Sequence, residues 1–125
     1  MFNSALIGCG RISHKHIEAY AKNAARMRLV AVCDPVADRA KAKSAEYLAT
    51  MVAARAAAPS SASPAPGVFA DYRLMLEEIH PDIVTIATES GYHPRIAIDC
   101  LNAGAHVICE KPLALSTKDA DAMIA

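Results

Sequence analysis

Short apolar runs alternate with helix-like segments along this 125-residue chain, and this alternation constrains its fold more than any other feature. Most of the runs are continuously hydrophobic, as in strands that are buried on both faces. The sequence predicts strands at residues 2–7, 29–33, 68–69, 82–87 and 106–109. Strands that are separated by helices pair in parallel, with helices on both faces of the sheet. The pattern therefore predicts an α/β fold with a Rossmann-type, doubly wound parallel sheet.

The segments between these runs have the spacing and the end signals of helices. We expect helices over 12–25, 36–51 and 71–79, a fourth from Pro94 to a cap at Ala103-Gly104, and a fifth entering at Thr117. Pro35 suits the first turn of the second helix, and Ser116 is a suitable N-cap for the fifth. Residues from about 53 to 66 are mostly Ala, Ser and Pro, which predicts a low-complexity surface loop, although residues 53–58 could instead prolong the second helix.

Composition excludes several classes of function. The 13 basic and 13 acidic residues balance, so the chain lacks the positive field of a nucleic-acid-binding protein. No apolar run reaches the roughly 18 residues of a membrane span. A secretory signal begins with basic residues, and this chain has none before Arg11, so we expect no such signal. The four cysteines and five histidines show no zinc-ligand spacing, so we expect no metal site and assign the cysteines to the core. These features predict a single soluble domain in the cytoplasm.

The first predicted strand leads into a glycine-rich turn, Gly8-x-Gly10-x-x-Ser13, that opens a helix. In a dinucleotide-binding fingerprint, the first glycine permits the tight turn and the second lets the backbone approach a pyrophosphate. Serine replaces the usual third Gly or Ala and is small enough to pack there. We expect Gly8, Gly10 and the adjoining Arg11 and Ile12 to contact the cofactor. An ordinary strand–helix turn would also account for the two glycines.

Asp34 follows the second predicted strand, 24 residues after Gly10. This is close to the spacing at which a carboxylate binds the ribose hydroxyls of NAD, and it would repel the 2′-phosphate of NADP. Asp34 could instead cap the turn before Pro35. Because methyltransferases also place an acidic residue here, the first half of the chain leaves the class of protein open.

The second half resembles a known family. The stretch PDIVTIATESGYHPRIAIDCLNAGAHVICEKPLALS, from Pro81 to Ser116, resembles the glucose–fructose oxidoreductase and inositol dehydrogenase family (Gfo/Idh/MocA). The segments ALIGCGRISHKHIEAY, LVAVCDP and DYRLML are similar to that family as well. The most specific element is Glu110-Lys111-Pro112 at the end of the fifth predicted strand.

The resemblance implies an NAD-dependent, less plausibly NADP-dependent, dehydrogenase of sugars, cyclitols or sugar derivatives. It implies that Lys111 is the catalytic, proton-transferring or polarising residue, that Glu110 lines the nicotinamide ribose, and that the Lys111–Pro112 bond is cis. It places Arg39 over the adenine. It also predicts that Thr88, Ser90 and His93, in the loop after the fourth strand, contact the nicotinamide side of the cofactor. In the same loop Glu89 replaces the family's usual proline.

The resemblance covers only an N-terminal cofactor-binding domain, 1–125. We expect this chain to stop before a sixth strand and before a C-terminal substrate domain, to bind cofactor weakly and to be inactive alone. The complete enzyme is expected to bind a sugar-type substrate through the second domain and to form a homo-oligomer. The Gly-Arg-Ile-Ser turn resembles enzymes of nucleotide-linked amino-sugar acids. Alternatives are a non-catalytic dinucleotide-binding or sensing module and an S-adenosylmethionine methyltransferase.

Overall fold

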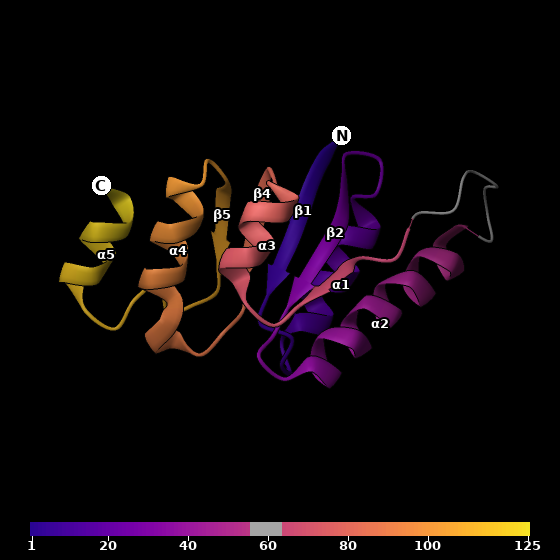
Figure 1. Cartoon of the computed structure of the whole chain (residues 1–125), viewed down its shortest axis with the longest axis horizontal. Coiled ribbons are helices and arrows are strands. Elements are labelled where there is room, and N and C mark those ends of the chain that lie inside the picture. The colour runs from indigo at the N-terminus through magenta and orange to yellow at the C-terminus, as the bar shows by residue number, and fades with distance from the viewer. Residues whose placement is uncertain (56–63) are drawn as a thin grey trace.

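Five parallel strands form the centre of the molecule. The computed structural model describes residues 1–55 and 64–125 (Figure 1). Its strands occur in the order β3-β2-β1-β4-β5, which is the start of the doubly wound order. Their bounds are β1 (Phe2–Ile7), β2 (Met27–Cys33), β3 (Gly67–Phe69), β4 (Ile83–Ile86) and β5 (His106–Cys109). The predicted fold class is confirmed.

Helices cover both faces of this sheet and create two separate cores. Helices α1 (Ser13–Lys22) and α2 (Ala37–Arg55) pack on one face, where Ile17 and Tyr47 are fully buried against β1 and β2. The other face packs against α3 (Tyr72–Ile79) and α4 (His93–Asn102), and α5 (Thr117–Ile124) packs on α4. A short 3₁₀ turn, η1 (Ser90–Tyr92), leads into α4. Ala5 and Ile7 of β1 face one core and Leu6 faces the other, so the C-terminal half of this strand is apolar on both sides.

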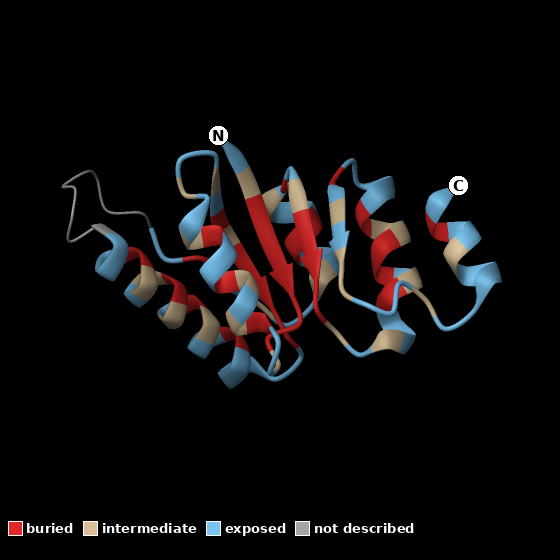
Figure 2. Cartoon of the chain, turned by 180° about the vertical axis from the view of Figure 1, so that it is seen from behind, coloured by how far each residue is buried: buried red, intermediate tan, exposed pale blue. Residues whose placement is uncertain are grey.

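Burial is greatest in the middle of the sheet. Figure 2 shows β1, β2 and β4 largely buried, whereas β5 at the end of the sheet is only partly covered. Cys9, Cys33 and Cys100 lie in the cores as predicted, Cys109 is half-buried, and all four thiols are free. Among the described residues, no helix is long and apolar enough to cross a membrane.

Several element boundaries differ from the prediction. Helix α1 ends at Lys22 because the Asn23 side chain donates a hydrogen bond to the Ala19 carbonyl, 2.9 Å away. Pro35 precedes α2 and does not form its first turn, because the Asp34 carboxylate accepts the backbone N–H of Val36 at 2.8 Å. That bond holds the two residues after Asp34 in a turn outside the helix.

The loop predicted from about residue 53 is wrong at its start. Helix α2 continues through Ala53 and Ala54 to Arg55, because alanine has the highest helix propensity of all residues. Residues 56–63 of the predicted loop lie outside the described residues. Residues 64–66 lead to β3, and the Ser44 hydroxyl of α2 donates a hydrogen bond to the Pro66 carbonyl at 2.9 Å.

The predicted helix caps are confirmed. Gly104 follows α4 with φ of 87°, and its N–H donates to the Leu101 carbonyl, as in a left-handed C-cap. The Ser116 hydroxyl accepts the N–H of Asp119 at 3.1 Å and starts α5 at Thr117. The Lys111–Pro112 peptide bond is cis, as predicted.

Candidate active site

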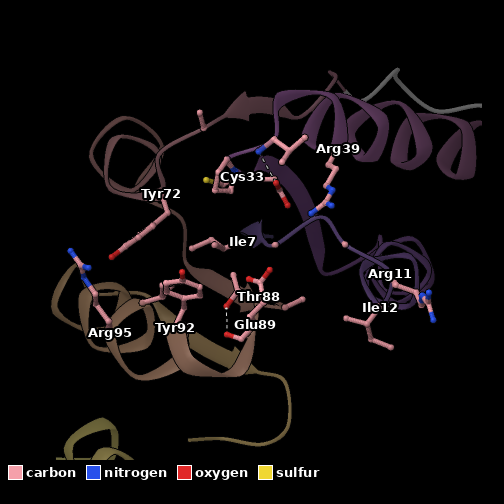
Figure 3. Close-up of a pocket in the computed structure, with 18 of the residues that line it drawn as sticks. Ile7, Arg11, Ile12, Cys33, Arg39, Tyr72, Thr88, Glu89, Tyr92 and Arg95 are labelled. Carbon is pink, nitrogen blue, oxygen red and sulfur yellow. Dashed lines mark hydrogen bonds between the residues drawn. The ribbon is translucent and has the colours of Figure 1, made fainter. Parts of the chain in front are cut away.

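A cavity of about 770 Å³ opens where β1, β2 and β4 end. In open α/β sheets ligands bind at this edge, between strands whose connections leave in opposite directions. Here β1 pairs with β2 along one edge and with β4 along its other edge. The chain leaves β1 by the crossover to β2, so the cavity lies at the point where the strand order reverses. Figure 3 shows the loops after β1, β2, β3 and β4 around this cavity. Of the predicted contacts, it is lined by Gly8, Gly10, Arg11, Ile12, Asp34, Arg39 and Thr88.

The two glycines of the fingerprint have different physical roles. Gly8 has φ of 95°, and a Cβ at this position would lie 2.5 Å from the carbonyl carbon of Ala87. Only glycine therefore fits where the first turn meets the end of β4. A Cβ on Gly10 would meet nothing within 4 Å, so this glycine leaves open space beside the cavity. That open side is where the backbone can approach a ligand.

Ser13 occupies the third fingerprint position and is completely buried. Its hydroxyl donates a hydrogen bond to the Gly10 carbonyl, so the buried oxygen has a partner. The substitution of serine for the usual glycine or alanine is therefore accommodated. The same hydrogen bond connects the glycine turn to Ser13, the first residue of α1. The N-terminus of such a helix favours an anion.

Asp34 connects the glycine turn to the end of β2. Its Oδ2 accepts the N–H of Cys9 at 2.9 Å, and its Oδ1 accepts the N–H of Val36. The carboxylate is 6% exposed and lines the cavity. The two interpretations of Asp34 are thus compatible, because it stabilises the turn before α2 and also presents a negative charge to the cavity.

The thiols near this turn are chemically inert. Cys9 and Cys33 are buried, and burial raises the pKa of each to about 12. For Cys9 the nearby Asp34 carboxylate is the second cause of the shift. Thiolates do not form at neutral pH under these conditions, which excludes both cysteines as nucleophiles. No group of three possible metal ligands occurs among the residues that the structure describes.

Cations outnumber carboxylates around the cavity. Four arginines line it, against Asp34 and Glu89. In Figure 3, Arg39 and Arg11 lie on the side of α1 and α2, and Arg95 lies opposite, beside Tyr92. This excess of positive charge matches a ligand that carries phosphate groups.

One wall of the cavity, formed by residues after β3 and at the start of α4, was not predicted from the sequence. Tyr72, Arg73, Tyr92 and Arg95 belong to it. Tyr72 donates a hydrogen bond to Asp99 at 2.6 Å, and the Arg73 guanidinium pairs with the same carboxylate at 3.0 Å. The signal was available, since loops that follow parallel strands meet at one edge of the sheet.

Four predicted contacts lie outside the lining of the cavity. Ser90 begins η1, and Lys111 is exposed in the loop after β5. His93 is 1% exposed, with its Nδ1 2.9 Å from the Pro112 carbonyl oxygen and its Nε2 3.0 Å from that of Thr88. This histidine is buried between two loops and does not face the cavity.

Glu110 is bonded to α1 and is not part of the cavity lining. Its Oε1 accepts a hydrogen bond from His16 Nε2 at 2.7 Å, and its Oε2 accepts the N–H of Lys111 at 3.3 Å. The hydrogen bond from His16 is the main reason why the pKa of Glu110 lies below its ordinary value. The contact of Glu110 with a nicotinamide ribose remains a prediction.

A family model matches residues 2–125. It describes the Gfo/Idh/MocA oxidoreductases with an NAD-binding Rossmann fold. This match excludes the methyltransferase alternative.

Individual relatives are similar over almost the whole chain. Inositol 2-dehydrogenase of Salmonella typhimurium is 29% identical over 121 residues, which are 97% of this chain and 32% of the relative. D-Apiose dehydrogenase of Paraburkholderia graminis is 33% identical over 99% of this chain and 28% of its own length. The crystal structure of the WlbA dehydrogenase from Bordetella pertussis, in complex with NADH and UDP-GlcNAcA, is 36% identical. It has a TM-score of 0.73 and covers 98% of this chain and 32% of its own. The chain thus spans about a third of the length of these relatives.

Proposed function

Because the chain belongs to the Gfo/Idh/MocA oxidoreductases, we propose that it is the cofactor-binding part of an NAD-dependent dehydrogenase of sugars or sugar derivatives. The observation that carries the proposal is the junction of the glycine turn with Asp34 at the cavity where β1, β2 and β4 end. The alternative, a module that binds or senses a dinucleotide without catalysis, has no use for a lysine beside the nicotinamide. The relatives described above are dehydrogenases, which supports the catalytic function.

The residues present fit a dinucleotide. The open side of Gly10 and the N-terminus of α1 are suited to the pyrophosphate, and the Asp34 carboxylate to the ribose hydroxyls. We assign Arg39 to the adenine and Thr88 to the nicotinamide end. When bound, NAD⁺ supplies the acceptor for the hydride of an alcohol. The protein must then remove the hydroxyl proton, and we assign this role to the Lys111 amine.

The proposed substrate class follows from the relatives. We place a sugar-type substrate beside Lys111, and among these favour a nucleotide-linked amino-sugar acid. The Gly-Arg-Ile-Ser turn and the 36% identity to a dehydrogenase solved with UDP-GlcNAcA support this choice. NADH formation by the complete polypeptide that carries this chain tests it, with UDP-GlcNAcA compared with myo-inositol. Faster turnover of myo-inositol overturns the choice.

Cofactor binding can be tested on this chain directly. The sequence contains no tryptophan, so the fluorescence of NADH itself reports binding. We expect NADH to bind at least about tenfold more tightly than NADPH, because the 2′-phosphate would face the Asp34 carboxylate. The Asp34→Asn variant should reduce this preference. Tighter binding of NADPH to the unmodified chain contradicts the assignment of Asp34, and failure of both cofactors to bind contradicts the proposed function.

Two properties of the complete protein belong to the same proposal. The four free cysteines are typical of a reducing compartment, which supports a cytoplasmic location. The homo-oligomer expected of the complete protein remains part of this proposal.

A further inference from the structure

Lys111 lies between two residues that are each held by a histidine. On one side, Nε2 of His16, from α1, is 2.7 Å from Oε1 of Glu110. On the other side, Nδ1 of His93, the first residue of α4, is 2.9 Å from the carbonyl oxygen of Pro112. The two histidines are 77 positions apart in the sequence and belong to helices on opposite faces of the sheet. Lys111 itself is exposed.

His93 also connects this loop to the cavity. Its Nε2 is 3.0 Å from the carbonyl oxygen of Thr88, and Thr88 lines the cavity. Carbonyl oxygens only accept, so a neutral ring donates its single N–H to one of these two carbonyls, and a protonated ring donates to both. The side chain is almost completely buried, where polar groups without partners are costly. His93 therefore fixes the loop after β5 against the loop after β4.

Glu110 receives a second constraint. Its N–H donates to the Ile86 carbonyl at 3.0 Å, which continues the pairing of β5 with β4 beyond the end of the strand. Its side chain spans from His16 to the N–H of Lys111. The backbone on the N-terminal side of Lys111 is thus held by both β4 and α1.

We propose that His16 and His93 are positioning residues that together hold the Glu110–Pro112 segment, and so set where the Lys111 amine lies relative to the cavity. The inference rests on the proposed function, in which that amine takes a proton from the substrate. Proton transfer requires the donor and acceptor to be within hydrogen-bond distance, so a mobile loop would reduce its rate. Neither histidine needs to contact cofactor or substrate for this role.

Side-chain amides distinguish the contacts of His93. Asparagine places an amide close to the position of Nδ1, and glutamine places one close to that of Nε2. His93→Asn should therefore retain the bond to Pro112, whereas His93→Gln should retain only the bond to Thr88. By the same geometry, His16→Gln should retain the bond to Glu110 and His16→Ala should lose it.

The measurement is ¹⁵N backbone relaxation on the isolated chain without cofactor, with amides of Glu110, Lys111 and Leu113 as probes. In the unmodified chain we expect order parameters near 0.85 at these amides. At Lys111 and Leu113 they should fall below about 0.6 in His93→Gln and His16→Ala, and stay high in His93→Asn and His16→Gln. At Glu110, whose N–H stays bonded to the Ile86 carbonyl, the decrease should be smaller. The control is His106→Gln, at the exposed start of β5, which should leave all three amides unchanged.

Unchanged order at all three amides in both His93→Gln and His16→Ala overturns the proposal. If the His93 variants do not fold, His16→Ala and His16→Gln still test whether His16 orders the segment. His16 is only partly buried on α1, so we expect both of these variants to fold. Equal loss of order throughout the chain would show a general structural role and would also contradict positioning. The readout needs no cofactor, so a failed NADH titration contradicts the proposed function without affecting this result.

Discussion

At the scale of single residues, the two fingerprint glycines illustrate how one motif combines folding and binding. Gly8→Ala should lower the free energy of unfolding by about 2 kcal/mol or more, because its φ is positive and its Cβ would overlap the Ala87 backbone. Gly10→Ala should change stability by no more than about 0.5 kcal/mol, since its Cβ meets no atom. Its methyl group should instead weaken NADH binding at least tenfold. Thermal unfolding and NADH titration of both variants separate these effects, and equal stability losses contradict the distinction.

Glu110 provides a pH-dependent prediction at the same scale. Its folded pKa is lowered, first by the hydrogen bond from His16, so its contribution is present above the ordinary value of 4.5 and is lost as pH falls through the folded pKa. Glu110→Gln should therefore be less stable than the unmodified chain at pH 7, by at most about 1 kcal/mol for a partly exposed pair. The difference should shrink as the pH is lowered from 7 to below 4.5. Urea midpoints at both pH values test this, and a difference that persists undiminished in acid contradicts it.

Sequence alone identified the residues whose roles are local. The glycine turn, Asp34 and the Ser116 cap depend on spacing within one strand–helix unit, and in the structure each lies at the predicted end of a strand or helix. The partners of Glu110 and His93 could not be inferred, because His16 is 94 positions from Glu110, and Thr88 and Pro112 contact the same ring from different loops. Such contacts are set by tertiary packing.

At the scale of elements, α5 depends on a single capping side chain and one buried anchor. It has eight residues, its Ser116 hydroxyl accepts the N–H of Asp119, and Met123 is its buried residue. Ser116→Ala should destabilise α5 by about 1 kcal/mol and so accelerate amide hydrogen exchange in α5 about fivefold. Ser116→Thr is the matched control and should retain slow exchange. Unchanged exchange in Ser116→Ala would show that packing on α4 alone maintains the helix.

The ends of the helices are set by helix propensity and by single side-chain hydrogen bonds more than by the hydrophobic pattern of the sequence. All five strands follow from short apolar runs and the main helices from helical spacing, and tertiary packing reinforces both. The end of α1 depends on a bond from Asn23, and the start of α2 on a bond to Asp34. Periodicity contains no information about either bond, so the predicted ends were displaced by a few residues.

At the scale of the whole molecule, β5 forms an end of the sheet and leaves Ile108 49% exposed, with Leu115 beyond it 70% exposed. Unpaired strand edges promote association. We expect the mass measured by light scattering to rise above 13.2 kDa with concentration. Ile108→Lys should prevent this increase, whereas Val68→Lys on β3, at the opposite end of the sheet, should not. A constant monomer mass at high concentration contradicts the prediction.

The pairing of β1 with β4 has a consequence for how the chain is made. Ser4 pairs with Ile83, 79 positions later, and every other strand pair also spans a crossover. At roughly 5–20 residues per second of synthesis, about 4 to 16 seconds separate the appearance of these two strands. During this interval β1 has completed one side of its pairing at most. Contacts so distant in sequence also slow folding from the denatured state. The central strand of the sheet is thus the first to be synthesised and among the last to be fully paired.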